Sequence, residues 1–529
     1  MKLVITSLLF VCIFSSLTFT TSSQVAQNLE FQKTFGGTSY DEAISIIGLP
    51  NGKSLIAGYT YSNIGSIICP SSSNFWIFQL DSTLNLEWMK CFGGSGSDEP
   101  KCIKKCSDGG YILIGRTNSK DGDVIGLHDP IFNPFWDIWV LKLDSSANIE
   151  WQKCFGGSLE DEGYDISITN DGGYILVGDV GSMDGDIIGN HGFDLWICKL
   201  NSIGSIVWSK CLGGYDYDVQ AYCIQTQDGG YLVTGTTLSL DSLVPDNHGE
   251  NGTADAWVVR LDSLGNVKWT KCYGGTDSDN GQKIFPTWDG GFYLVCNVSS
   301  QDGDVGPHLG NISIWLIRAD SLGTIIWQKT YGGINADLAY NAIRTSDGGI
   351  AVVGETRGIP GLISVSHGFG DFSIIKVDSL GNAEWGNAFG GSDLDMAYSI
   401  YECENQSFVL AGVTSSNDFD VTNYQGNDDA WVVKLAPANV SVSELENSFM
   451  DLKIFQNNNQ IFLRFFSKKN ETGQVYLYDV NGKKVFEKNL SVNEGINYSS
   501  LNCEKFSSGM YLVKIESEKG WQSGKVFIN

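Results

Sequence analysis

The residues best suited to chemistry include three short Asp-Gly-Asp segments, which lie in polar loops between predicted strands. Their carboxylates belong to Asp121, Asp123, Asp184, Asp186, Asp302 and Asp304. Closely spaced carboxylate oxygens are the hard ligands that calcium accepts, so these six residues are the candidate calcium ligands. The segments lack the later glycine and terminal Glu of an EF-hand loop. A turn that uses Asp and Gly for its backbone conformation is therefore the favoured interpretation, with calcium as the alternative.

One histidine lies in the same variable connection of each of five consecutive units. The five are His128, His191, His248, His308 and His367. Zinc needs ligands that converge on one point, and the chain has no HExxH or paired CxxC motif to bring them together. We therefore expect the loops around these histidines to form a ligand-binding face, without a zinc centre or an organic cofactor.

Catalytic motifs are absent from the sequence. It has no hydrolase elbow, P-loop or dinucleotide fingerprint in its strand and helix context. Acidic residues are so abundant that their spacing cannot identify a glycosidase pair. Four residues depart from the repeat near the end of the second strand of their units: Arg116, Asp179, Asn297 and Glu355. A shifted pKa and a cleft beside such a residue would favour an enzyme.

The strands between these loops carry a seven-residue motif, called the phrase below. It occurs seven times and reads WQKCFGG at Trp151–Gly157. Its copies start near residues 31, 88, 151, 208, 269, 327 and 385. A steady period of roughly 60 residues indicates an array of like units. Each unit reads as four short strands separated by Gly, Asn and Asp turns, with no helical period. We therefore predict an all-β protein in which residues 27–437 form a seven-bladed β-propeller.

The two ends of the array complement each other. No further copy of the phrase follows Leu435, whereas Phe31–Gly36 precedes any other strand of its unit. We expect this N-terminal strand to complete the last blade beside Asp429–Leu435, because closure removes the exposed edges of a linear array.

Repetition separates scaffold from function. Each unit has an aspartate four residues after the second glycine of its phrase, at Asp41, Asp98, Asp161, Asp218, Asp279, Asp337 and Asp395. A carboxylate needed by every blade is more simply an acceptor for backbone N–H groups than a catalyst. The aromatic residue that leads each phrase is interpreted as inter-blade packing, and stacking on sugars is the alternative.

Composition excludes several classes of partner. The formal net charge is -27, which repels nucleic acids and anionic lipid surfaces and favours small cations.

Met1 to about Ser23 has the pattern of a secretory signal, and no later segment is long and apolar enough to span a bilayer. Cys91 is a candidate to pair with Cys102 or Cys106, although buried free thiols are an equally good interpretation. We expect a monomer.

The character of the chain changes after a linker at residues 438–450. Residues 451–529 alternate as strands, with a hairpin turn at Asn481-Gly482, and predict a small antiparallel β-sandwich. The segments VYLYDVNGKKV, INYSSLNCEKFSSGMYLVKI and GKVFIN resemble the type A C-terminal sorting domain of type IX secretion in Bacteroidetes-type bacteria. FQNNNQ stands where that family usually opens with Pro-Asn-Pro. An ordinary immunoglobulin-like accessory module or a sugar-binding module is the alternative.

The resemblance implies export in two stages, first to the periplasm and then across the outer membrane through the type IX machinery. The tail indicates a secreted or cell-surface location and leaves the activity open. Two functions remain: a binding or adhesion module that holds a glycan, protein or peptide, which is favoured, and an extracellular polysaccharide hydrolase or lyase acting at the channel mouth.

Overall fold

The computed structural model describes residues 27–528 except 63–68, 70–72, 129–134, 242–243, 245, 250–251, 359–362, 364–365, 438–448, 458–459, 468, 480–482 and 518–519. The signal segment, most of the linker and the turn at Asn481-Gly482 lie outside the described residues. The chain divides into two compact units, Met1–Ala438 and Asn439–Asn529. Within the described residues, the elements are β-strands apart from one 3-10 turn at Pro50–Gly52.

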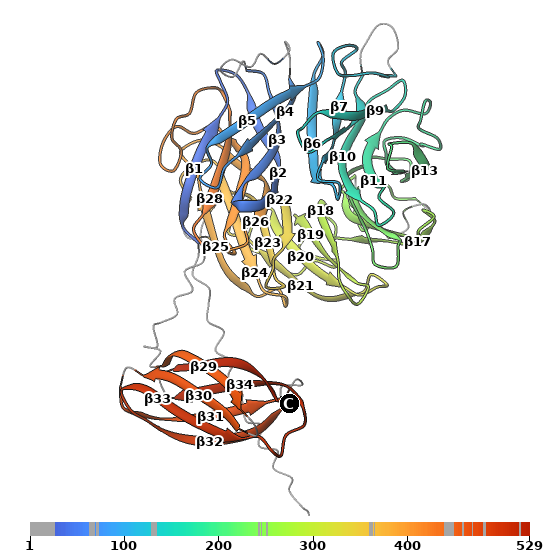
Figure 1. Cartoon of the computed structure of the whole chain (residues 1–529). Helices are drawn as coiled ribbons and strands as arrows, with labels where there is room; N and C mark the ends of the chain where they lie inside the picture. The colour runs from blue at the N-terminus through green and yellow to red at the C-terminus, as the bar shows by residue number, and fades with distance from the viewer. Residues whose placement is uncertain are drawn as a thin grey trace, which may run out of the picture. The chain divides into compact units, whose positions relative to one another are not determined.

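The described part of the first unit contains seven four-stranded antiparallel sheets (Figure 1). The first strands of the sheets are β2 (Asp41–Gly48), β6 (Asp98–Lys105), β10 (Asp161–Ile168), β14 (Asp218–Gln225), β18 (Asp279–Pro286), β22 (Asp337–Arg344) and β26 (Asp395–Glu402). The second strands are β3 (Ser54–Thr60), β7 (Tyr111–Thr117), β11 (Tyr174–Val180), β15 (Tyr231–Thr237), β19 (Phe292–Val298), β23 (Ile350–Thr356) and β27 (Phe408–Thr414).

The other two strands complete each sheet. The third strands are β4 (Asn74–Leu80), β8 (Asp137–Leu143), β12 (Asp194–Leu200), β16 (Asp255–Leu261), β20 (Ser313–Ala319), β24 (Asp371–Val377) and β28 (Asp429–Leu435). The fourth strands are β5 (Leu86–Phe92), β9 (Ile149–Phe155), β13 (Ile206–Leu212), β17 (Val267–Tyr273), β21 (Ile325–Tyr331), β25 (Ala383–Phe389) and β1 (Leu29–Phe35).

The first strands line the middle of the array. Each contacts the first strand of the next sheet, and β26 contacts β2, so the series returns to its start. The sheet of β26, β27 and β28 takes β1 as its fourth strand, with Phe31 opposite Lys434 and Thr34 opposite Trp431. The Trp431 indole Nε1 donates to Gln32 Oε1 at 2.9 Å. The two ends of the unit are therefore joined within one sheet.

The core lies between neighbouring sheets. Second and third strands are almost wholly buried because both of their faces pack against another sheet. Trp196 of β12 packs with Ile112 and Ile114 of β7 in one apolar cluster that spans two sheets. The aromatic residue of the repeated phrase is only half-buried in most units. Trp151 of β9 nevertheless contacts Tyr174 of the next sheet, with ring centroids 5.9 Å apart, which is the predicted inter-blade packing.

The repeated aspartates serve the backbone. One carboxylate oxygen of each accepts the N–H of the second glycine of its phrase at 2.6–2.9 Å. Serine side chains donate to the same carboxylates, as Ser182 does to Asp161 at 2.7 Å. Each aspartate therefore fixes the crossover between two sheets, as a structural acceptor would.

The partner of Cys91 differs from both partners that the sequence suggested. Cys91 forms a disulfide with Cys69, whose Cα atom lies 5.7 Å away, and not with Cys102 or Cys106. Both of those residues are buried free thiols. The pairing joins the loop after β3 to strand β5 of the same sheet, and the variable loop sequence gave no signal for it.

The second unit contains two antiparallel sheets in its described residues. One has the order β29 (Phe449–Asn457), β30 (Gln460–Ser467), β33 (Gly495–Asn502). The other has the order β32 (Lys484–Val492), β31 (Glu471–Tyr478), β34 (Gly509–Ser517), β35 (Gly520–Ile528). Leu463 of the first sheet and Leu477 and Val513 of the second belong to one buried apolar cluster. The described residues include no helix with the length and hydropathy needed to cross a membrane.

Candidate functional site

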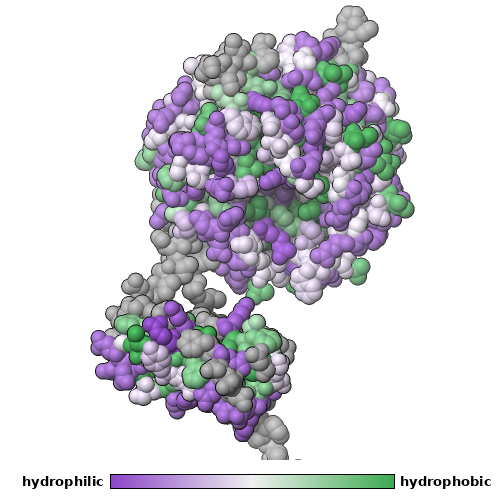
Figure 2. Space-filling model, viewed as in Figure 1, coloured by the Kyte–Doolittle hydropathy of each residue, from purple (hydrophilic) through white to green (hydrophobic). Residues whose placement is uncertain are grey.

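The candidate site is the space enclosed by the seven first strands, a cavity of about 780 Å³. Each of these strands has a bulge that shifts its register near the middle, for example between Gly163 and Asp165 of β10. A bulge re-aims side chains, so that Tyr164 and Asp165 both line the cavity. Figure 2 shows hydrophilic and hydrophobic residues mixed over one face of this unit.

Three carboxylates occupy the second position of consecutive first strands. They belong to Glu42, Glu99 and Glu162, of which Glu42 and Glu99 line the cavity. Arg116 of β7 donates to Glu99 Oε2 at 2.6 Å and also bonds Glu162 of the next sheet. Its guanidinium lies over the Trp136 ring at 4.2 Å. Burial disfavours the charged guanidinium, but Glu162 and Glu99 together raise the pKa of Arg116.

Glu42 has a different environment from its two counterparts. Burial raises the pKa of its carboxyl group, and a hydrogen bond from Tyr59 opposes this shift only in part. Burial also raises the pKa of the Tyr59 hydroxyl group, with Glu42 adding to the effect. Glu42 is thus a carboxyl group biased toward its neutral form, whereas Glu99 and Glu162 are bound to a guanidinium.

The four departures from the repeat lie beside this layer, and three of them connect neighbouring sheets. Arg116 bonds Glu162 as described. Asp179 accepts the backbone N–H of Gln220 at 3.0 Å, and burial raises the pKa of its carboxyl group. Asn297 makes two bonds to the Ala339 backbone at 2.7 and 2.9 Å. Glu355 stays within its own sheet and bonds Arg357 and Tyr340. Arg116, Asp179 and Asn297 therefore also hold neighbouring sheets of the inner ring together.

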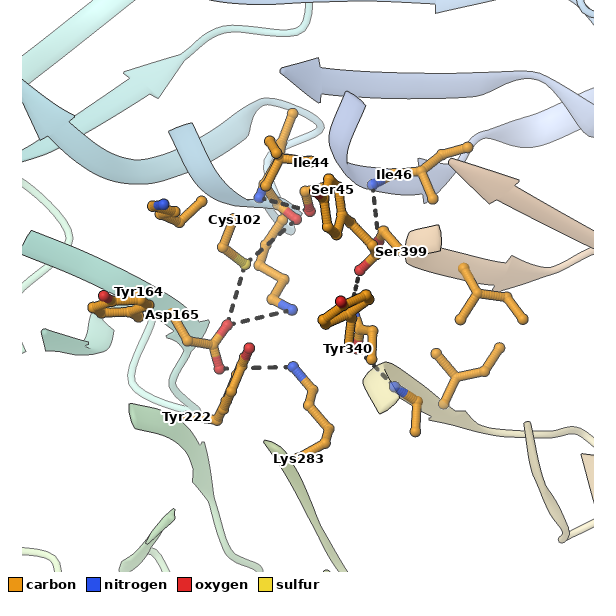
Figure 3. Close-up of a pocket in the computed structure, with 18 of the residues that line it drawn as sticks. Ile44, Ser45, Ile46, Cys102, Tyr164, Asp165, Tyr222, Lys283, Tyr340 and Ser399 are labelled. Atoms are coloured by element: carbon orange, nitrogen blue, oxygen red, sulfur yellow. Dashed lines mark hydrogen bonds and ion pairs between the residues drawn. The ribbon is translucent and has the colours of Figure 1, made fainter. Parts of the chain in front are cut away.

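A second polar cluster lies deeper in the channel, around Asp165 (Figure 3). Its carboxylate accepts a bond from the Cys102 thiol at 3.1 Å and one from the Cys223 backbone N–H at 3.3 Å. Lys104 and Lys283 place their ammonium groups 3.8 and 4.0 Å from the same carboxylate. Sequence reasoning missed this cluster. A signal was available at the fifth position of the first strands, which holds Cys102, Asp165 and Lys283. The residue there is Ser in two units and Cys, Asp, Tyr, Lys or Asn in the others.

The Asp-Gly-Asp segments fold against the glycine turns before the first strands. Asp121, Asp184 and Asp302 each accept a backbone N–H from the residue after the second glycine, at 2.6, 2.7 and 2.8 Å. The later aspartates of the segments are Asp123, Asp186 and Asp304, whose own N–H groups donate to the carbonyl of the first glycine.

The three segments belong to three different sheets and do not come together. Among the described residues, no group of three or more His, Cys, Asp or Glu side chains forms a cation site. The bonds found agree with a turn that organises its own backbone. Calcium at these segments stays a prediction.

Each histidine is bound within its own sheet to the first residue of the third strand. The Nδ1 atoms of His128 and His248 lie 2.9 and 2.8 Å from the carboxylates of Asp137 and Asp255. His191 Nδ1 lies 3.7 Å from Asp194, His308 Nδ1 bonds the Ser313 hydroxyl group, and His367 donates its backbone N–H to Asp371. His128 Nε2 also lies 3.6 Å from Asp186 of the next sheet, but the five histidines do not converge.

Comparison with known proteins identifies the C-terminal part of the chain. Residues 457–529 match the family model described as a secretion system C-terminal sorting domain. This type IX sorting domain implies contact with the secretion machinery and a secreted or cell-surface location. The chain thus carries a C-terminal sorting domain after its array of four-stranded sheets.

Solved structures resemble the chain only distantly. Puromycin hydrolase is 9% identical with a TM-score of 0.41, and the match covers 82% of this chain and 58% of that one. BBS1N in complex with ARL6DN is 9% identical, with a TM-score of 0.42 and coverage of 79% and 99%. A glycoside hydrolase family 32 structure from Bifidobacterium adolescentis is 9% identical, with a TM-score of 0.28 and coverage of 94% and 95%. This chain spans about three-fifths of the length of puromycin hydrolase. No curated protein matches the chain.

Proposed function

We propose that the protein is an exported binding protein that holds a glycan at one opening of its central channel. In this proposal the seven sheets of residues 27–437 are the blades of a seven-bladed β-propeller. Residues 451–529 form a small β-sandwich that acts as the export address. The single observation that carries the binding site is the layer of Glu42, Glu99 and Arg116, which breaks the repeat and lines the cavity, with Glu162 bound to Arg116.

The position of this layer supports a binding role. Because the strands alternate in direction, the connections from second to third strands leave the array at the same end as the crossovers into the next sheet. The three glutamates lie near the start of their strands and therefore at that end. Binding sites normally use variable loops on a rigid scaffold, and these are the connections that vary most in length.

Aromatic side chains near the same end supply the other half of a sugar site. Tyr40 and Tyr61 are 49% and 45% exposed, and their rings lie 6.5 Å apart. Tyr59, which lines the cavity, lies 6.0 Å from Tyr61. Rings that stack on the apolar face of a sugar, together with carboxylates that accept from its hydroxyl groups, give both orientation and affinity.

The experiment is a glycan-array screen of the purified protein and of two variants. Tyr61→Ala removes an exposed ring near the channel opening. Trp288→Ala removes a ring that is 82% exposed in the short turn between β18 and β19, at the opposite end of the array. We expect Tyr61→Ala to weaken binding at least about tenfold and Trp288→Ala to leave it unchanged. Absence of any glycan signal, or equal losses in both variants, would refute the proposed site.

Hydrolysis of a polysaccharide is the second candidate function, and one observation favours it. Glu42 has a raised pKa, while Glu99 and Glu162 bind Arg116, so the carboxyl groups at one channel end have contrasting environments. A neutral acid beside an ionised carboxylate is the division of roles that glycosidases use. Product analysis of every glycan bound on the array tests this function. Cleavage that Glu42→Gln abolishes without loss of binding would establish the enzyme.

A further inference from the structure

The polar cluster in the middle of the channel has more positive than negative charge. Lys104 extends from β6 and Lys283 from β18, and both face Asp165 of β10. Among the described residues, Asp165 is the one carboxylate within 4 Å of either ammonium group. Two ammonium groups thus share a single carboxylate.

Asp165 accepts hydrogen bonds from other donors, whereas both lysines lie too far from it for a hydrogen bond. The Cys102 thiol bonds one oxygen at 3.1 Å, and the Cys223 backbone N–H bonds the other at 3.3 Å. The two ammonium groups remain at 3.8 and 4.0 Å, beyond hydrogen-bond distance. An ammonium group has three donors, so most donors of both lysines are left for another acceptor.

The surroundings disfavour the charge on Lys283. Burial lowers the pKa of Lys283, and the nearby Lys104 adds to the effect. Burial also opposes ionisation of Asp165, but Lys283 and Lys104 together hold the pKa of its carboxyl group below the usual value. With Asp165 ionised and both lysines protonated the cluster carries one net positive charge. A buried charge without a partner is costly, and a bound anion would compensate it.

The cluster has both the space and the access that a ligand needs. All three residues line the cavity of about 780 Å³, together with Tyr222 (Figure 3). The Lys283 ammonium lies 4.7 Å from the centroid of the Tyr222 ring, which provides an apolar wall. The Lys104 side chain is 34% exposed, so the site is open to solvent.

We propose that Lys104 and Lys283 bind the carboxylate or sulfate group of a small ligand inside the channel. The site lies deeper than the layer around Arg116 and is independent of the glycan binding proposed there. Its ligand is a monovalent oxyanion, because one negative charge neutralises the cluster. A free carboxylate, a sugar acid and a sulfate group share this chemistry, and the choice of probe separates them.

Calorimetric titration of the full chain tests the proposal with sodium acetate, sodium D-glucuronate and sodium methyl sulfate, which are all monovalent anions, and with glucose as the uncharged control. We expect at least one anion to bind saturably and glucose not to bind at this site. Lys283→Met should weaken anion binding at least about tenfold, because one of two cations is lost. Lys101→Met is the matched control. Lys101 lies on the same strand as Lys104 and lines the cavity, but its ammonium group lies over the Tyr164 ring at 5.8 Å and forms no described ion pair with Asp165. It should leave affinity within about twofold.

The decisive variant is Asp165→Asn, which removes the competing negative charge and should strengthen anion binding several-fold. A purely structural role for the cluster would make Asp165→Asn and Lys283→Met weaken binding alike, and that outcome would overturn the proposal. So would binding of glucose that Lys283→Met weakens as much as it weakens binding of glucuronate, or no binding of any of the three anions. If Lys283→Met does not fold, Lys283→Gln replaces it, and a saturable rise of the wild-type melting temperature with anion concentration gives a second measure.

Discussion

Acidification from pH 7 to pH 5 should stabilise the first unit, because carboxyl groups meet in buried pairs at the junctions between sheets. Asp161 and Asp137 approach the same glycine, Gly156, and Asp218 and Asp194 approach Gly213 in the same way. Burial, with the neighbouring carboxylate adding a smaller effect, raises the pKa values of Asp161, Asp218 and Asp395 to about 6.

The direction follows from proton binding. An aspartate whose pKa is 3.8 in the unfolded chain and about 6 in the folded protein is protonated more readily when folded. Above pH 6 the ionised carboxylate destabilises the folded protein, and protonation removes this destabilisation as the pH falls from 7 to 5. Each such group adds about 1.3 kcal/mol to the free energy of unfolding over this interval, and the three together add about 4 kcal/mol. Aspartates with lowered pKa values, such as Asp171 at about 2, titrate below this window.

Thermal unfolding of the full chain, followed by intrinsic fluorescence at constant ionic strength, gives the measurement. For an array of roughly 400 residues, 4 kcal/mol corresponds to a rise of about 5 °C in melting temperature. The chain offers a natural control, because Asn74 occupies in one sheet the position that Asp194 has in another. Asp194→Asn should raise the melting temperature at pH 7 and reduce its dependence on pH. A melting temperature that falls or stays constant between pH 7 and pH 5 would refute the reasoning.

Three further predictions concern other parts of the chain. Deletion of residues 451–529 should keep the protein inside the cell, as cell fractionation would show, and normal surface delivery of the truncated form would contradict the sorting role. Calcium bound at the Asp-Gly-Asp segments would make excess chelator lower the melting temperature, and an unchanged curve would exclude it. Trp196→Ala should cost about 3–5 kcal/mol of unfolding free energy, because the ring is wholly buried between two sheets. The exposed Trp288→Ala should cost less than about 0.5 kcal/mol in the same denaturation experiment.

Much of the architecture could be predicted because repetition makes a weak local signal strong. One copy of WQKCFGG is consistent with many folds, whereas seven copies define the unit, its four strands and its boundaries. The deficit after Leu435 and the surplus at Phe31 together indicated a shared sheet, and these two segments do pair. The family model confirms the sorting domain, whose terminal motifs are local in sequence.

The chemistry of the channel could not be predicted in the same way. Lys104, Asp165 and Lys283 come from three different units, and only the ring of first strands brings them together. Their positions within the repeat were visible, but the bulge that turns them toward the cavity was not. The partner of Cys91 lies in a variable loop, where the repeat gives no alignment. Sequence repetition thus identifies the scaffold, while residues that differ between units need the three-dimensional arrangement.

The pairing of Leu29 with Leu435 has a mechanical consequence. The chain enters the array at Leu29 and leaves it at Leu435. These two positions are neighbours at the end of the array where the short turns lie. Any force transmitted through the tail therefore enters the array through β28, which is hydrogen-bonded on one side to β27 and on the other to β1. A pull at this point loads a central strand of its sheet instead of peeling an edge strand.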